Sequence, residues 1–131
     1  MKHLLIVEDD PDHRLILRTM FEAEGYQCEE AMDGQGALSI LSTDQVGLVL
    51  TDLNMPRMNG LQLIDEMKTL ASTQNIPVIL LTSQLMEDIP GRAYTNSARA
   101  VLSKPFDFSQ LLAEVRCAIG QPELSALCST G

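Results

Sequence analysis

The chain has 131 residues, of which 45% are apolar, and it carries a formal net charge of −9 at pH 7. Its length suits one domain, and no apolar run approaches the roughly 18 residues that a membrane-spanning helix needs. The acidic balance argues against direct binding to nucleic acid, because such binding requires a basic face. The first residues, MKHLLIVEDD, lack the pattern of a secretory signal peptide. We therefore expect a cytoplasmic protein without membrane contacts.

The three cysteines, Cys28, Cys117 and Cys128, are odd in number and lack the spacing of metal ligands. Reduced thiols are the expected state in a cytosolic protein. Cys28 and Cys117 lie in segments with an apolar pattern, so we expect them to fill space in the core. Cys128 belongs to a polar tail.

The first part of the chain predicts two strand–helix pairs. Residues 3–7 form a short apolar run that is typical of a buried strand, and residues 12–25 show helical periodicity that ends at a glycine. Residues 26–31 alternate weakly and predict a second strand, which is followed by a turn signal and a short helix over 33–42. The residues expected on one stripe of the first helix are Ile16, Leu17, Met20, Phe21 and Ala23.

The second part of the chain continues the alternation of apolar runs and amphipathic segments. Residues 53–60 predict a loop, because Pro56 and Gly60 interrupt it. Asp107 is a suitable N-cap for the last helix. Residues 121–131 show no strong pattern, and we expect them to form a tail or the start of a linker after one domain over 1–120. The expected elements are a strand at 47–52, a helix at 61–70, a strand at 76–83, a helix within 86–98, a strand at 100–103 and a helix at 108–120.

This succession of five strand–helix pairs predicts an α/β fold with a parallel sheet. Apolar strands that alternate with helices indicate a sheet covered on both faces, and right-handed crossovers restrict the topology to a doubly wound sheet. For five strands we expect the order 2-1-3-4-5, which opens a crevice between the carboxyl ends of the first and third strands. Glu8, Asp9 and Asp10 follow the first strand and Asp52 ends the third, so acids from two strands are expected to meet there.

The acidic run after the first strand raises an electrostatic question. Two carboxylates about 4 Å apart repel each other by on the order of 4 kcal/mol at an effective dielectric constant of about 20. A hard divalent cation removes this repulsion by taking the carboxylates as its ligands. Asp10 has a simpler explanation, because an acid there matches the dipole at the N-terminus of the following helix.

Four side chains end or directly follow strands at one edge of the expected sheet: Asp9, Asp52, Thr82 and Lys104. Each is weak evidence alone, because an isolated residue of these types usually belongs to a turn, a strand or the surface. Together and in this order, the motifs VEDDP, LTDLNMPRMNG, ILLTS and VLSKPF resemble the receiver domain of two-component response regulators. The resemblance covers residues 1–120 and implies a flavodoxin-like (βα)5 sandwich of three layers.

The resemblance also implies a site for Mg²⁺ or Mn²⁺. It makes Asp9 a direct carboxylate ligand and Glu8 an outer one that acts through water. Asp52 supplies a second carboxylate, and the backbone carbonyl of Asn54 supplies a third ligand. A donor set made of oxygen atoms suits Mg²⁺.

Asp52 is the phosphoacceptor that the resemblance implies. A carboxylate can attack a phosphoryl group to give an aspartyl phosphate, and the transfer depends mostly on positioning and charge neutralisation. Lys104 would place its ammonium group on one phosphoryl oxygen, and Thr82 would donate its hydroxyl to another. The peptide bond between Lys104 and Pro105 is expected to be cis.

The implied function is that of a phosphoacceptor signalling module. Such a module takes a phosphoryl group from a sensor histidine kinase or a phosphotransfer protein and then changes its affinity for a downstream effector. The expected effector face consists of the helix within 86–98, the strand at 100–103 and the helix at 108–120. The module promotes its own phosphorylation and dephosphorylation, so we expect no enzyme that turns over an external substrate. The sequence fits both a stand-alone receiver and an excised domain.

One position departs from the receiver pattern. Receivers commonly carry an aromatic residue three positions before the lysine, and here that position holds Val101. A branched aliphatic side chain cannot make the corresponding swing of an aromatic ring from the surface into the core. Our hypothesis is that switching depends instead on reordering within residues 83–99.

Two other classes of protein share part of this pattern. Phosphohydrolases with an aspartate nucleophile place it after the first strand as D-x-D, whereas this chain has EDD there and DLN after the third strand. Flavodoxins bind a flavin on the same fold, but they need a phosphate cradle where this chain has three acids. Both classes fit the sequence less well than a receiver.

Overall fold

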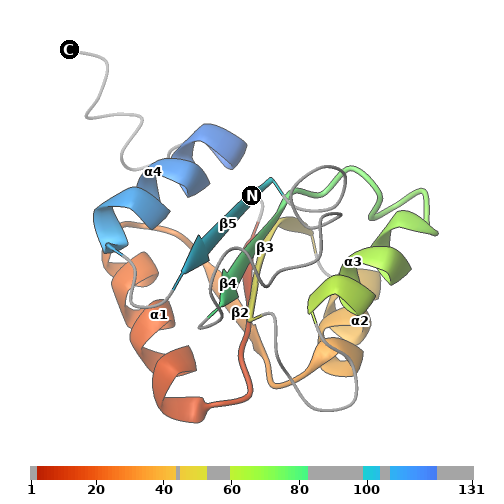
Figure 1. Cartoon of the computed structure of the whole chain (residues 1–131), viewed down its shortest axis with the longest axis horizontal. Coiled ribbons are helices and arrows are strands. Elements are labelled where there is room, and N and C mark those ends of the chain that lie inside the picture. Colours follow the sequence, from red (N-terminus) through yellow and green to blue (C-terminus); the bar gives the residue numbers. More distant parts are fainter. Residues whose placement is uncertain (1–2, 44, 53–59, 83–98, 104–106, 121–131) are drawn as a thin grey trace.

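The computed structural model describes residues 3–43, 45–52, 60–82, 99–103 and 107–120. They form a parallel five-stranded sheet in the order β2-β1-β3-β4-β5, with helices on both faces (Figure 1). The predicted doubly wound α/β fold and its strand order are confirmed. The strands are β1 (His3–Val7), β2 (Cys28–Ala31), β3 (Val46–Asp52), β4 (Val78–Thr82) and β5 (Ala100–Ser103). The helices are α1 (Pro11–Ala23), α2 (Gly34–Thr43), α3 (Gly60–Lys68) and α4 (Phe108–Ile119).

Each described element overlaps the segment that predicted it. The helix named α4 is therefore the one expected at 108–120. The helix expected within 86–98 lies outside the described residues, as do the loop residues 53–59 and the segment 121–131. No described helix is both long enough and apolar enough to cross a membrane.

Side-chain caps explain where the helices begin. The carboxylate of Asp10 accepts a hydrogen bond from the backbone N–H of Asp12 at 2.9 Å, and Asp107 accepts one from Ser109 at the same distance. Asp107 is therefore the N-cap that was predicted, and Asp10, which was expected to match the helix dipole, is the N-cap of α1. After α1, Gly25 adopts a φ of 97°, a left-handed conformation that glycine takes without strain, and the chain turns toward β2.

The sheet divides the core into two apolar clusters, because successive strand residues point to opposite faces. Leu4 and Ile6 of β1 pack with α1 and α4, whereas Leu5 and Val7 pack with α2 and α3. These two pairs of helices lie on opposite faces of the sheet (Figure 1). The central strand β3 alternates in the same way from Leu48 to Leu50. This three-layer arrangement leaves the two ends of the strands as the edges where polar side chains can gather.

The apolar stripe expected on α1 is narrower than predicted. Leu17 and Phe21 are buried, but Ile16 is 53% exposed and Ala23 is also exposed. Consecutive helical residues lie about 100° apart, so a helix that covers one sheet face buries its i, i+4 row and turns its neighbours outward.

The prediction that Cys117 fills the core is wrong, because this side chain is exposed. On α4 the buried residues include Leu112 and Val115, and Cys117 lies about 200° around the helix from Val115. Cys28 is partly buried against the cluster under α1 and α4. Burial raises the pKa of its thiol to about 12, so this cysteine stays protonated.

Candidate metal centre

The carboxyl edge of the sheet brings acids from two strands together. Val7 of β1 is paired with Thr51 of β3. The residues that follow them in the sequence, Glu8 and Asp52, therefore lie at the same end of the two neighbouring strands. In parallel strands these ends meet at one edge of the sheet, which is where the sequence predicted an acidic crevice.

The structure confirms that the predicted acids meet. Glu8, Asp9 and Asp52 each offer a carboxylate oxygen, and these three oxygens all lie within 4.8 Å of one another. Glu8 is only 2% exposed, Asp52 is partly exposed and Asp9 is exposed. The cluster therefore has a buried base and an open side that faces solvent.

This donor set fits a hard divalent cation. Mg²⁺ binds oxygen ligands at about 2.1 Å, so two ligands on opposite sides of one ion lie about 4.2 Å apart. The three carboxylate oxygens need only small shifts to reach such an arrangement.

Backbone hydrogen bonds hold the acidic run in place. The backbone N–H of Glu8 donates to the carbonyl of Ala31 at 3.0 Å, which extends the pairing of β1 with β2 by one residue. The N–H of Asp10 lies 3.3 Å from a carboxylate oxygen of Glu8. The run is thus tied to the sheet on one side and to the start of α1 on the other.

Arg14 is a contact of this site that the sequence analysis missed. Its Nη1 donates to the backbone carbonyl of Glu8 at 2.7 Å, and its Nε donates to a carboxylate oxygen of Glu30 at 2.9 Å. Glu30 also accepts from Arg18, and this hydrogen bond is the main reason that its pKa lies below the ordinary value. The sequence carries no clear signal of this contact, because a basic residue on an amphipathic helix usually faces water.

Of the other three predicted site residues, one lies within the described part of the chain and two lie outside it. Thr82 ends β4 at the same edge of the sheet and is fully buried. Asn54 and Lys104 lie outside the described residues, although Ser103, which precedes Lys104, is paired with Thr82. The roles assigned to these residues remain predictions.

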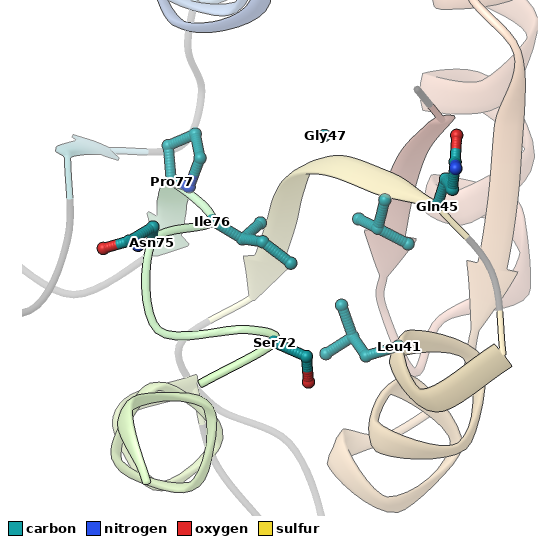
Figure 2. Close-up of a pocket in the computed structure, with 8 residues that line it drawn as sticks. Leu41, Gln45, Gly47, Ser72, Asn75, Ile76 and Pro77 are labelled. Atoms are coloured by element: carbon teal, nitrogen blue, oxygen red, sulfur yellow. The ribbon is translucent and has the colours of Figure 1, made fainter. Parts of the chain in front are cut away.

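A pocket of about 470 Å³ lies at the opposite edge of the sheet. Figure 2 shows Leu41 from the end of α2 and Ile76 from the segment before β4 on its facing sides. Glu8, Asp9, Asp52 and Thr82, the predicted site residues that the structure describes, do not line it. The described residues around it are uncharged: Leu41, Gln45, Val46, Gly47, Ser72, Asn75, Ile76 and Pro77.

Known proteins share both the sequence pattern and the architecture. Residues 4–116 match the response regulator receiver domain family. The chain is 36% identical over 102 residues to the sensor histidine kinase RcsC of Escherichia coli K12, which covers 78% of this chain and 10% of RcsC. It is 35% identical over 128 residues to the transcriptional regulatory protein PdtaR of Mycobacterium tuberculosis, covering 96% of this chain and 61% of PdtaR. The chain thus spans about a tenth of one relative and less than two thirds of the other.

A solved structure is similar over nearly its whole length. The response regulator TrrA of Thermotoga maritima, in complex with Mg²⁺ and BeF, is 28% identical. Its TM-score is 0.79, and the alignment covers 90% of this chain and 99% of TrrA. From the family match over residues 4–116 and these similarities, this chain belongs to the response regulator receiver domain family.

Proposed function

We propose that this chain is the phosphoacceptor module of a two-component system and that Asp52 accepts the phosphoryl group. The observation that carries the proposal is the meeting of the Glu8, Asp9 and Asp52 carboxylates at one edge of the sheet. In a receiver-family chain, such a cluster suits cation-assisted phosphoryl transfer. Asp52 is the best nucleophile of the three, because it ends the central strand and remains partly exposed.

The residues that would hold Mg²⁺ or Mn²⁺ are Asp9 and Asp52 through their carboxylates, Asn54 through its backbone carbonyl and Glu8 through water. A bound Mg²⁺ would supply positive charge that offsets the repulsion of the carboxylates and of the phosphoryl oxygens. The likeness to TrrA, which was solved with Mg²⁺ and BeF, supports this assignment.

The transfer step forms one bond and breaks one bond. A carboxylate oxygen of Asp52 attacks the phosphorus of a phosphohistidine, a P–O bond forms as the P–N bond breaks, and the leaving imidazole takes up a proton. Lys104 places its ammonium group on a phosphoryl oxygen, and Thr82 donates its hydroxyl to another. Both act by neutralising charge and by positioning.

The partners follow from this chemistry. The donor is a sensor histidine kinase or a phosphotransfer protein, and the acceptor of the signal is an effector that reads the face formed by residues 86–98, β5 and α4. We propose a cytoplasmic location, a receiver domain over 1–120 and a tail or linker over 121–131. The module turns over no external substrate.

The proposed switch differs from that of receivers with an aromatic residue three positions before the lysine, because this chain has Val101 there. The side chain of Val101 is partly buried against the apolar cluster under α2 and α3, three residues before Lys104. We propose that phosphorylation reorders residues 83–99 instead of rotating an aromatic ring. Backbone NMR shifts with and without beryllofluoride and Mg²⁺ test this, and shifts that spare residues 83–99 would contradict it.

Intact-mass measurement after treatment with acetyl phosphate and Mg²⁺ tests the main proposal. We expect the wild type to gain one phosphoryl group and Asp52→Asn to gain none. Asp65→Asn is the matched control, because Asp65 is an exposed aspartate on α3. Equal labelling of the wild type and Asp52→Asn would contradict the assignment of Asp52 as the phosphoacceptor. Hydrolysis of a phosphomonoester by the wild type, lost in Asp52→Asn, would instead indicate a phosphohydrolase.

A further inference from the structure

A side chain of α1 hydrogen-bonds to the backbone at the acidic cluster. β1 ends at Val7 and α1 begins at Pro11, so Glu8 belongs to the segment that connects them. The residue is 2% exposed, and a buried carbonyl without a partner costs free energy. The Nη1 of Arg14 donates to the backbone carbonyl of Glu8 at 2.7 Å.

Arg14 is itself fixed from a second direction. Its Nε donates to Glu30 at 2.9 Å, and Glu30 lies on β2, paired with Ile6 of β1. The side chains of Arg14 and Glu30 are 20% and 27% exposed, so the pair is partly buried. A planar guanidinium group can hold two acceptors at once in a fixed geometry, which a lysine cannot do. The two hydrogen bonds of the Arg14 guanidinium group, to Glu8 and to Glu30, form a fork that joins α1, β2 and the end of β1.

We infer that Arg14 is a positioning residue for the cation site. By holding the carbonyl of Glu8 against α1 and β2, it fixes the backbone from which the side chains of Glu8 and Asp9 reach their shared position with Asp52. The inference rests on the proposed function, because it takes this cluster to be a cation site. Groups that orient metal ligands from behind typically change metal affinity by about 10-fold to 100-fold when they are removed.

Charge and position predict opposite effects for the loss of Arg14. Arg14 is positive, so its removal leaves the neighbourhood of the cluster more negative and should strengthen the binding of a cation. Loss of positioning should weaken it. A fall in Mg²⁺ affinity on removal of a positive charge is therefore a result that simple electrostatics does not produce.

The experiment is an NMR titration with Mg²⁺ that follows the amide signals of Glu8, Asp9 and Asp52. We expect Arg14→Met to bind Mg²⁺ about tenfold more weakly than the wild type. Arg18→Met is the matched control, because Arg18 also donates to Glu30 from α1 and carries the same charge, and its other hydrogen bond goes to Glu22. We expect this variant to bind as tightly as the wild type or more tightly.

Arg14→Lys keeps the charge but not the fork, so we expect an affinity between those of the wild type and Arg14→Met. It also keeps the test valid if Arg14→Met does not fold, and unaltered binding by Arg14→Lys would then overturn the inference. Equal affinities of Arg14→Met and the wild type, or equal losses in Arg14→Met and Arg18→Met, would overturn it as well. A wild type that shows no Mg²⁺-dependent shifts at these amides would refute the cation site itself, and the inference with it.

Discussion

The two edges of the sheet are built from the same strands but carry different chemistry. At the carboxyl edge, Glu8, Asp9 and Asp52 converge in a small acidic cluster. At the amino edge, a pocket of about 470 Å³ is lined by uncharged residues such as Leu41 and Ile76 (Figure 2). The acids converge at the carboxyl edge because the strands that carry them run in the same direction.

The backbone explains the difference between the edges. Helices that follow parallel strands begin at the carboxyl edge, where their N-terminal N–H groups favour negative charge. At the amino edge the helices end, and their last carbonyl groups need donors. Hydroxyl groups supply these donors: Thr69 donates to the carbonyl of Glu66 at 2.7 Å, and the buried Thr73 donates to Met67. The carboxyl edge therefore accommodates acids, whereas hydroxyl groups satisfy the last carbonyl groups of α3 at the amino edge.

The largest expected effect concerns stability at the amino edge. Leu41 is 7% exposed and packs in the cluster under α2 and α3, so Leu41→Ala should lower the free energy of unfolding by about 2 to 3 kcal/mol. Urea denaturation measures this loss. The Mg²⁺ affinity of the folded variant should equal that of the wild type, and a change in affinity would mean that the two edges are not independent.

The next effect concerns cation binding at the carboxyl edge. Asp9→Asn removes a charged ligand from the proposed Mg²⁺ site, so we expect its Mg²⁺ affinity to fall more than about tenfold. Asn75→Asp is the reciprocal control, because it adds a carboxylate to the pocket at the amino edge. Calorimetric titration should show little change for Asn75→Asp. A change in the Mg²⁺ affinity of Asn75→Asp as large as that of Asp9→Asn would show that the two edges do not differ in cation binding.

Without a divalent cation, the acidic cluster should lower stability. Asp52→Asn removes one of three carboxylates whose oxygens lie within 4.8 Å of one another. In buffer that contains a chelator, we expect this variant to be about 1 kcal/mol more stable than the wild type, a rise of a few degrees in Tm. Added Mg²⁺ should stabilise the wild type and leave Asp52→Asn nearly unchanged. Asp65→Asn on α3 should follow the wild type, and a lower Tm for Asp52→Asn would contradict the argument.

The sequence predicted the fold well because its signals are local and repeated. Apolar runs of strand length and the caps Asp10 and Asp107 lie where the elements begin and end, and the alternation of strands and helices leaves few topologies. The exposure of Ile16 and Cys117 was not predictable in the same way. Their segments are apolar on average, and the rotation of a helix against its sheet depends on tertiary packing.

The acids of the candidate site were predictable because their positions depend on strand direction alone. Glu8, Asp9 and Asp52 meet for that reason. The contact of Arg14 with the carbonyl of Glu8 was not predicted, because a basic residue on an amphipathic helix usually faces water. Only the position of Glu30 on the neighbouring strand shows why this arginine turns toward the sheet.

The smallest expected effect is a pH dependence of stability that comes from the ion pairs of Glu30 with Arg14 and Arg18. Hydrogen bonds from Arg18 and Arg14 hold the pKa of Glu30 below its ordinary value of 4.5. The stability that Glu30 contributes is therefore present in full above about pH 4.5 and is lost as the pH falls through its lower pKa in the folded state. We expect Glu30→Gln to be less stable than the wild type by no more than about 1 kcal/mol at neutral pH, because the pair is partly solvated.

Urea denaturation of both proteins between about pH 3 and pH 7 measures this effect, and the difference in stability should shrink as the pH falls. Glu66→Gln, on α3, is the control for the loss of one exposed negative charge. If the difference for Glu30→Gln stayed constant down to the lowest pH, the ion pairs would not be its source. The fork that holds Glu8 in place would then derive no stability from its contact with β2.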